Sequence, residues 1–393
     1  MNFTLKIIIF LSLLTGALHS YAQQIVNPPA LEKLLAGKTK YYDIVATVDS
    51  FYAKALRNLS PADANQQSTL KRQMKMWQRW KMQASIRLQA DGTVANALTY
   101  VLPAWEQQAS IHQHGPSGNW KTLGPTNYNT TGGHNGGLGR VNCVAFSPSN
   151  TNLVYAGTAN GGLWRREGNG NWTALTDHLP SVSISGVVVN YQNANDIWIL
   201  TGDGDSGGSQ GMYSAGVFES HDAGSTWKAS GQFPGLRDTL YNGYKLIQHP
   251  TDPAIFFACT SKGLYRSSNY CSSWTRVNPS LWLWPGTSNL RLPSYTDIEF
   301  KPDNPNTIYV TSNEVSPTFQ RSTDGGLTFT PISNTQLNAA RRLAIGVSPH
   351  QPNRIYLLSG PATGPGMFNG FFSSADSGNT WATNATTPNI LGY

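Results

Sequence analysis

An eight-residue pattern recurs along this 393-residue chain and limits the folds that the chain can adopt. The pattern reads SHDAGSTW at 220–227, STDGGLTF at 322–329 and SADSGNTW at 374–381, and weaker copies end at Trp172 and Trp274. The closing aromatic residues lie 47 to 55 residues apart. A fixed period of this length is typical of chains that build one supersecondary unit per repeat. We therefore expect a repeat protein.

A second marker runs in the same phase. Four prolines are each followed seven residues later by an aromatic residue, in the pairs Pro148–Tyr155, Pro250–Phe257, Pro302–Tyr309 and Pro349–Tyr356. Each repeat reads as strand, polar turn, strand, variable loop, strand, octet turn and strand. Four strands in a period of about 50 residues predict an all-β propeller with five recognisable four-stranded blades.

The octet residues suit a tight hairpin between the third and fourth strands of a blade. An acid accepts hydrogen bonds from turn amides, a glycine tolerates positive φ, and an aromatic ring wedges between blades. These positions are Asp222, Gly224 and Trp227, then Asp324, Gly326 and Phe329, then Asp376, Gly378 and Trp381. We therefore expect the three acids along an outer edge, on the face opposite the ligand-binding loops.

The octet resembles the Asp-box, or bacterial neuraminidase repeat, of sialidases, xyloglucan-cleaving propellers and sortilin-type receptors. The stretches WQRW (77–80), GLGRVN (137–142) and TGDGDSGG (201–208) are similar to segments of large exported Bacteroidota proteins. Those proteins carry a sortilin-like Asp-box propeller and a type IX secretion sorting domain. The resemblance implies an exported propeller that uses the secretion machinery as a partner.

The first 22 residues have the features of a secretory signal. One lysine precedes an apolar run over 7–18, and a small-x-small ending favours cleavage after Ala22. The run is shorter than the roughly 20 residues of a membrane-spanning helix. We expect a secreted or cell-surface protein without a membrane span once the signal is removed.

Residues 23–115 are predicted to be a helical segment that precedes the propeller of 116–393. A helix start is indicated at 60–63, and an apolar stripe expected to pack on the main domain follows it, formed by Leu70, Met74, Trp77, Ala84 and Leu88. The stretch GNWKTLGP (118–125) resembles the last strand of a blade. Because the last octet already has its own closing strand, we expect an incomplete ring in a chain truncated at its C-terminus.

Charge argues against nucleic-acid binding, and the cysteine spacing argues against a disulfide. The net charge of +7 arises mainly from residues 25–115, with 11 Lys and Arg against 6 Asp and Glu, whereas 116–393 is nearly neutral, so nucleic-acid binding is not expected. Cys259 and Cys271 are too far apart along a hairpin to form a disulfide. We predict three free thiols, with Cys143 buried in a strand.

The candidate site lies on the long loops between second and third strands, because long loops on a rigid scaffold commonly carry recognition. Asp203 and Asp205 could bind calcium, cap a turn or act as catalytic acids. Arg140 opens the innermost strand of the first repeat, and the proline marker aligns Arg341 with it in the fifth. Two guanidiniums at a channel mouth grip a ligand carboxylate, or they pair with acids and carbonyls that line the channel.

Two functions remain open. The first is binding of an extracellular glycan or protein by the loop-rich face. The alternative is glycoside hydrolysis of the xyloglucanase or sialidase type with non-standard acids. The Phe/Tyr-Arg-Ile-Pro motif of sialidases is absent, and Ala159 in GTANGGLW stands where xyloglucan-cleaving propellers have a catalytic acid. The resemblance therefore favours binding, with Asp203 as a substitute acid if the protein is an enzyme.

Overall fold

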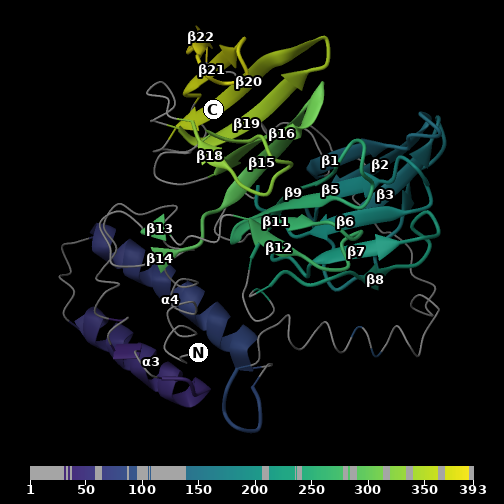
Figure 1. Cartoon of the computed structure of the whole chain (residues 1–393). Helices are drawn as coiled ribbons and strands as arrows, with labels where there is room; N and C mark the ends of the chain where they lie inside the picture. The colour runs from purple at the N-terminus through teal and green to yellow at the C-terminus, as the bar shows by residue number, and fades with distance from the viewer. Residues whose placement is uncertain are drawn as a thin grey trace. The chain divides into compact units, whose positions relative to one another are not determined.

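The computed structural model divides the chain into two compact units, a helical unit and a unit of strands. Figure 1 shows both along the chain. The structure describes residues 31, 34–35, 38–57, 64–85, 88–94, 105, 107, 139–205, 212–234, 236, 241–277, 282–283, 290–312, 319–332, 340–361 and 368–388. The predicted signal peptide and the strand predicted at 118–125 lie outside these residues, so both stay predictions. No helix among the described residues is long and apolar enough to cross a membrane.

The helical unit is a pair of helices, α3 (Tyr41–Arg57) and α4 (Ala64–Ser85). Leu70 and Trp77 of the predicted stripe are buried in a cluster with residues of α3 and with two leucines that precede it, Leu31 and Leu35. The indole N–H of Trp77 donates to Asp49 of α3 at 2.6 Å. The stripe thus packs within the helical unit, mainly on α3, which the sequence analysis did not predict as a distinct helix. Its predicted contact with the propeller remains a prediction.

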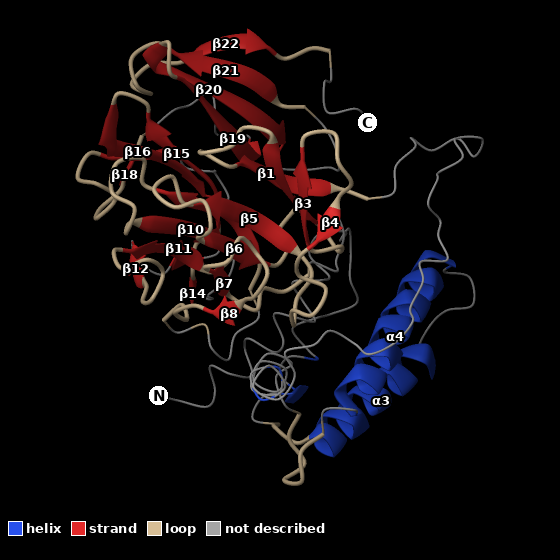
Figure 2. Cartoon of the chain, turned by 90° about the vertical axis from the view of Figure 1, so that its right-hand side faces the viewer, coloured by secondary structure: helices blue, strands red, loops and turns tan. Residues whose placement is uncertain are grey.

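The strand unit consists of five four-stranded antiparallel sheets, each with its strands in chain order from the centre outwards. Figure 2 shows the five sheets following one another as blades. Blade 1 is β1 (Val141–Phe146), β2 (Leu153–Thr158), β3 (Leu163–Glu167) and β4 (Thr173–Ala174), and blade 2 is β5 (Ile184–Val189), β6 (Ile197–Thr201), β7 (Val217–Ser220) and β8 (Lys228–Ala229). Blade 3 is β9 (Gly243–Gln248), β10 (Phe256–Thr260), β11 (Gly263–Ser267) and β12 (Thr275–Val277).

Blade 4 is β15 (Tyr295–Lys301), β16 (Asn304–Ser312), β17 (Phe319–Ser322) and β18 (Thr330–Pro331), and blade 5 is β19 (Ala340–Ser348), β20 (Gln351–Pro361), β21 (Gly370–Ser374) and β22 (Ala382–Ala385). A short ribbon of β13 (Trp282–Leu283) and β14 (Leu290–Arg291) lies between blades 3 and 4 in the chain. This is the predicted all-β propeller with five recognisable blades.

Each octet closes the hairpin between the third and fourth strands of its blade. In blade 4, Asp324 Oδ1 accepts from the backbone N–H of Thr328 at 3.0 Å, and Oδ2 accepts from the Thr328 hydroxyl at 2.6 Å. The hydroxyl bond leads the causes that lower the pKa of Asp324 to about 2. Gly326 has φ of +79°. The same bonds recur at Asp222 and Asp376, with Gly224 and Gly378 in the left-handed region.

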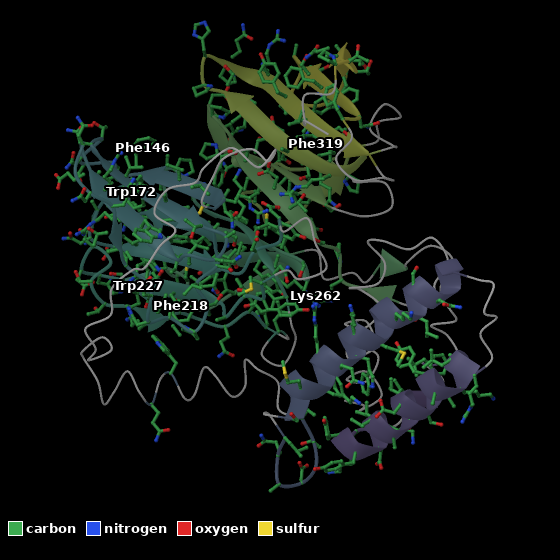
Figure 3. All side chains as sticks on the ribbon, turned by 180° about the vertical axis from the view of Figure 1, so that it is seen from behind. Phe146, Trp172, Phe218, Trp227, Lys262 and Phe319 are labelled. Carbon is green, nitrogen blue, oxygen red and sulfur yellow. The ribbon has the colours of Figure 1, made fainter. Side chains whose placement is uncertain are left out.

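The octet aromatics contact the preceding blade. The Trp227 indole donates to the carbonyl of Leu175 in blade 1 at 3.1 Å, and Trp381 meets Phe319 of blade 4 edge-on at 5.2 Å. Phe329 belongs to a buried cluster shared with blade 3. Figure 3 labels Trp227 beside Phe218 on blade 2. The octet therefore joins one blade to the next.

The exposure of the innermost strands differs between blade 1 and the other described blades. In blades 2 to 5, one equivalent position of the innermost strand faces the preceding blade and is at most 9% exposed. The residues at this position are Val187, Leu246, Ile298 and Ile345. The equivalent Val144 of blade 1 is 55% exposed and Phe146 is 61% exposed. Phe146 and Trp172, which is also exposed, are labelled in Figure 3. The described blades thus leave this face of blade 1 uncovered.

The three cysteines are free, as predicted. Cys259 and Cys271 are buried. Cys143 lies in β1 as predicted, but as a residue it is half-buried and not fully buried. Burial of its thiol near Ile184 of blade 2 still raises the pKa of Cys143 to about 12.

Candidate functional site

The candidate site lies at the rim where the innermost strands begin. In a blade whose strands run in order from the centre outwards, this rim also carries the loops between second and third strands, while the octet turns lie on the opposite face. Arg140 immediately precedes β1, Asp203 and Asp205 follow β6, and Tyr244 and Arg342 lie near the starts of β9 and β19. Four blades therefore contribute to one rim site.

Arg140 ties blade 1 to the loop of blade 2. Its guanidinium forms an ion pair with the Asp203 carboxylate and donates to the backbone carbonyl of Asp205 at 2.8 Å. Its Nε donates to Asn142 Oδ1 at 2.9 Å, which holds the side chain in place. The Asp203 side chain is 3% exposed, whereas the Arg140 side chain is 43% exposed. A partly exposed arginine side chain therefore caps a buried carboxylate.

The loop that carries the two acids folds tightly. Asp203 Oδ1 accepts from the backbone N–H of Asp205 at 3.0 Å, which is the turn-capping arrangement. Asn242 of the blade 3 entry donates to the Asp203 carbonyl at 3.0 Å. A Cβ at Gly204 would lie 2.2 Å from the Tyr244 ring. Glycine is therefore required where the loop crosses this ring.

Asp205 is held from the far side by blade 5. Arg342 forms an ion pair with the Asp205 carboxylate, and its guanidinium lies 5.3 Å from the centre of the Tyr244 ring. Such a cation–π contact contributes about 0.5–2 kcal/mol. The Arg342 and Asp205 side chains are 42% and 36% exposed. Asp205 is thus paired with a guanidinium and remains partly accessible.

The strand register identifies Arg342, rather than Arg341, as the counterpart of Arg140. The Arg140 carbonyl accepts from the amide of Ala159, one residue beyond the Thr158 partner of β1. In blade 5 the residue opposite Gly360, which is the equivalent of Ala159, is Arg342. The bulge of β1 lies between Val141 and Cys143, whereas that of β19 lies nearer the strand start, between Ala340 and Arg342. This difference shifts an alignment based on the proline marker by one residue. The Arg341 side chain lies outside the described residues, so its predicted role is untested.

The predicted calcium site remains a prediction. Within the described ranges, no group of three or more His, Cys, Asp or Glu side chains is arranged to hold a metal ion. The carboxylates of Asp203 and Asp205 accept from Arg140 and Arg342, so the two acids and two arginines neutralise one another. Calcium would have to displace a guanidinium from each acid. The turn-capping alternative is the one that the hydrogen bonds fit.

Sequence reasoning missed three members of the site, namely Asn242, Tyr244 and Arg342. Their contacts join blades 2, 3 and 5, and nothing in the local pattern of one repeat reports such a contact. The long loops of 312–319 and 359–370 are only partly described, and their predicted contribution to recognition stays a prediction. The box acids Asp222, Asp324 and Asp376 take no part in the site.

No family model matches the chain. One curated relative is a xyloglucanase of Paenibacillus sp, which is 26% identical over 223 residues, or 50% of this chain and 21% of that protein. Another is xyloglucanase Xgh74A of Acetivibrio thermocellus, which is 24% identical over 284 residues, or 64% of this chain and 31% of that protein. The chain therefore spans about a fifth to a third of the length of these relatives. The similarity is to proteins named xyloglucanases.

Two solved GH74 structures align with part of the chain. An ancestral GH74 enzyme superposes with a TM-score of 0.50 at 20% identity, over 67% of this chain and 32% of that one. A GH74 xyloglucanase of Xanthomonas campestris gives a TM-score of 0.48 at 19% identity, over 64% and 38%. The strand unit has the propeller fold of the ancestral enzyme. Resemblance to sortilin or to type IX secretion proteins is not part of these findings.

Proposed function

We propose that this chain is part of an exported, glycoside-hydrolase-like propeller that engages a glycan at the rim site. The observation that carries the proposal is the sequence similarity to xyloglucanases, which covers half or more of the chain. It favours the glycoside-hydrolase alternative over an unspecified glycan- or protein-binding module. The rim site supplies the recognition groups, because the side chains of Arg140 and Arg342 are partly exposed there and each guanidinium carries several N–H donors.

The charges of the site favour a neutral glycan. Arg140 and Arg342 are each neutralised by a carboxylate of the same loop, so an acidic ligand would compete with Asp203 and Asp205. Sugar hydroxyls need no such exchange, because they accept from the exposed N–H groups while the ion pairs stay in place. The sialidase-like alternative, in which two arginines grip a ligand carboxylate, is less compatible with this arrangement.

Hydrolysis by this chain is a second candidate, and the geometry limits it. Acid/base hydrolysis of a glycoside uses a protonated carboxyl as the acid and a carboxylate as the base or nucleophile. Asp203 is buried and bound to a guanidinium, which leaves Asp205 as the more accessible of the two carboxylates. Ala159 provides no acid at the position where the resemblance implies one. The described site therefore accounts for glycan binding, and turnover by the hydrolase alternative is tested separately.

The direct test measures binding and turnover together. The purified chain would be titrated with xyloglucan oligosaccharides in a calorimeter and incubated with the polymer in a reducing-sugar assay. Polygalacturonate is the acidic control, and a sialylated oligosaccharide tests the sialidase alternative. We expect saturable binding of the neutral glycan and none of the acidic controls. Failure to bind any neutral glycan would refute the proposal, and turnover abolished by Asp205→Asn would establish an enzyme.

A further inference from the structure

A second cluster of charges lies below the rim, on the innermost strands of blades 3 and 4. Lys245 of β9 donates to Asp297 at 2.7 Å and to Glu299 at 2.6 Å, and both acids belong to β15. The Asp297 side chain is 12% exposed, and those of Lys245 and Glu299 are 29% and 31% exposed. The proposed glycan contacts do not use this cluster.

Asp297 connects three blades through one carboxylate. Its Oδ1 accepts from Lys245 of blade 3 and from the backbone N–H of Ile298, its neighbour in blade 4, at 2.9 Å. Its Oδ2 accepts from the backbone N–H of Ile345 in blade 5 at 2.6 Å. Hydrogen bonds to an ionised acceptor are stronger than neutral ones. Glu299, in contrast, contacts Lys245 only among the bonds described for it.

The strands that Asp297 connects are those that carry the Tyr244–Arg342 contact. Tyr244 directly precedes Lys245 in β9, and Arg342 lies three residues before Ile345 in β19. Any change in the spacing of β9 and β19 would move the Arg342 guanidinium relative to the Tyr244 ring, which it now meets at 5.3 Å. The same displacement would move Arg342 away from Asp205.

We propose that Asp297 is a positioning residue for the rim site. It sets the distance between β9 and β19, so that Arg342 lies over Tyr244 and reaches Asp205. The ligand-binding consequence rests on the proposed function, whereas the effect on the order of the rim does not. A residue that merely stabilised the fold would lower the melting temperature without selective loosening of the segment 203–205.

The test is hydrogen exchange of the rim amides, which requires no ligand. In Asp297→Ala we expect exchange at 203–205 and 342–345 to rise about tenfold, since a hydrogen bond to a charged group is worth that factor or more. Asp297→Asn keeps only one of the two acceptor oxygens, so we expect an increase smaller than that of Asp297→Ala. Glu299→Gln leaves Asp297 intact and is the matched control, and we expect it to exchange within about twofold of the unaltered chain.

Two results would overturn the proposal. One is unchanged exchange at 203–205 in a folded Asp297→Ala protein, and the other is an equal increase in Glu299→Gln, which would assign the effect to the charge cluster as a whole. If Asp297→Ala does not fold, Asp297→Glu takes its place. It keeps the charge but displaces the carboxylate by one methylene, and it is expected to raise exchange at the same two segments.

Glycan affinity separates this proposal from the proposed function. If the chain binds xyloglucan, Asp297→Ala should raise Kd about tenfold, and adding Arg342→Ala should cause little further loss, because both changes remove the same contact. Additive losses would contradict an action of Asp297 through Arg342. If no glycan binds, the proposed function fails, while the exchange experiment still decides the role of Asp297.

Discussion

Arg140 and Arg342 occupy equivalent positions on the innermost strands of blades 1 and 5, and each forms an ion pair with one acid of the same loop. That loop belongs to blade 2 and carries Asp203 and Asp205. The loop therefore joins blades 1 and 5 at the rim, although β1 packs on β5 and β19 packs on β15. The site thus forms where arginines of blades 1 and 5 pair with the two carboxylates of the blade 2 loop.

Gly204 allows the loop to cross the Tyr244 ring, and a side chain there should disrupt the site. We expect Gly204→Ala to cost about 1–3 kcal/mol, because its Cβ would lie 2.2 Å from the ring. Glycan affinity should fall with it, since Tyr244 also supports Arg342. Gly139→Ala is the matched control, because a Cβ there meets nothing within 4 Å. Chemical denaturation measures the stability of both variants, and calorimetric titration measures their glycan affinity. Equal stability and equal affinity in the two variants would contradict the prediction.

The box acids should affect stability and leave ligand binding intact. Asp324→Ala removes the acceptor for the amide and hydroxyl of Thr328, and we expect a loss of about 1–2 kcal/mol, as for other capping carboxylates. Asp324→Asn should lose less, because one oxygen remains to accept the amide. Denaturant unfolding measures both. A loss of glycan affinity without a loss of stability would show that the box has a role at the site.

His249 should make stability depend on pH in the mildly acidic range. Burial lowers the pKa of His249, and its Nδ1 accepts from the backbone N–H of Asp252 at 3.0 Å. The fold therefore favours the neutral ring, so its contribution is present above the ordinary pKa of about 6.5 and is lost as pH falls through the lower folded value.

Thermal unfolding between pH 7.5 and pH 5 measures this dependence. His249→Phe keeps an aromatic ring against Phe300, whose ring centre lies 5.2 Å away, and it cannot titrate. Its melting temperature should change less with pH than that of the unaltered chain. An identical pH dependence in both proteins would assign the effect to other groups.

The blades could be predicted from the sequence, whereas most contacts of the site could not. The difference is the sequence separation of the residues that interact. Each octet is a local unit, because Asp324 bonds residues four positions away, so its pattern is visible in a single repeat. The Arg342–Asp205 pair joins residues 137 positions apart through the packing of the blades. Such a contact depends on the tertiary arrangement, and no periodicity reports it.

The prediction of Arg341 shows how a small irregularity misleads a sequence alignment. Counting back from the proline marker assumes that every innermost strand has the same number of residues. Blades 1 to 4 carry a bulge at the same register, whereas the bulge of blade 5 lies nearer the start of its strand, between Ala340 and Arg342, which breaks that assumption by one residue. In a strand, one residue also moves a side chain to the other face. The register therefore aligns the neighbouring Arg342 with Arg140, and the predicted role of Arg341 stays a prediction.

The central claim is that the rim binds a glycan and the boxes build the fold, and one paired measurement tests it. Affinity for xyloglucan oligosaccharides and melting temperature would be measured for Arg342→Ala and Asp376→Ala. The account predicts that Arg342→Ala raises Kd about tenfold or more, since it removes charge-assisted donors, while Asp376→Ala lowers the melting temperature and leaves Kd unchanged. The reverse outcome, with unaltered affinity in Arg342→Ala and lost affinity in Asp376→Ala, would contradict it.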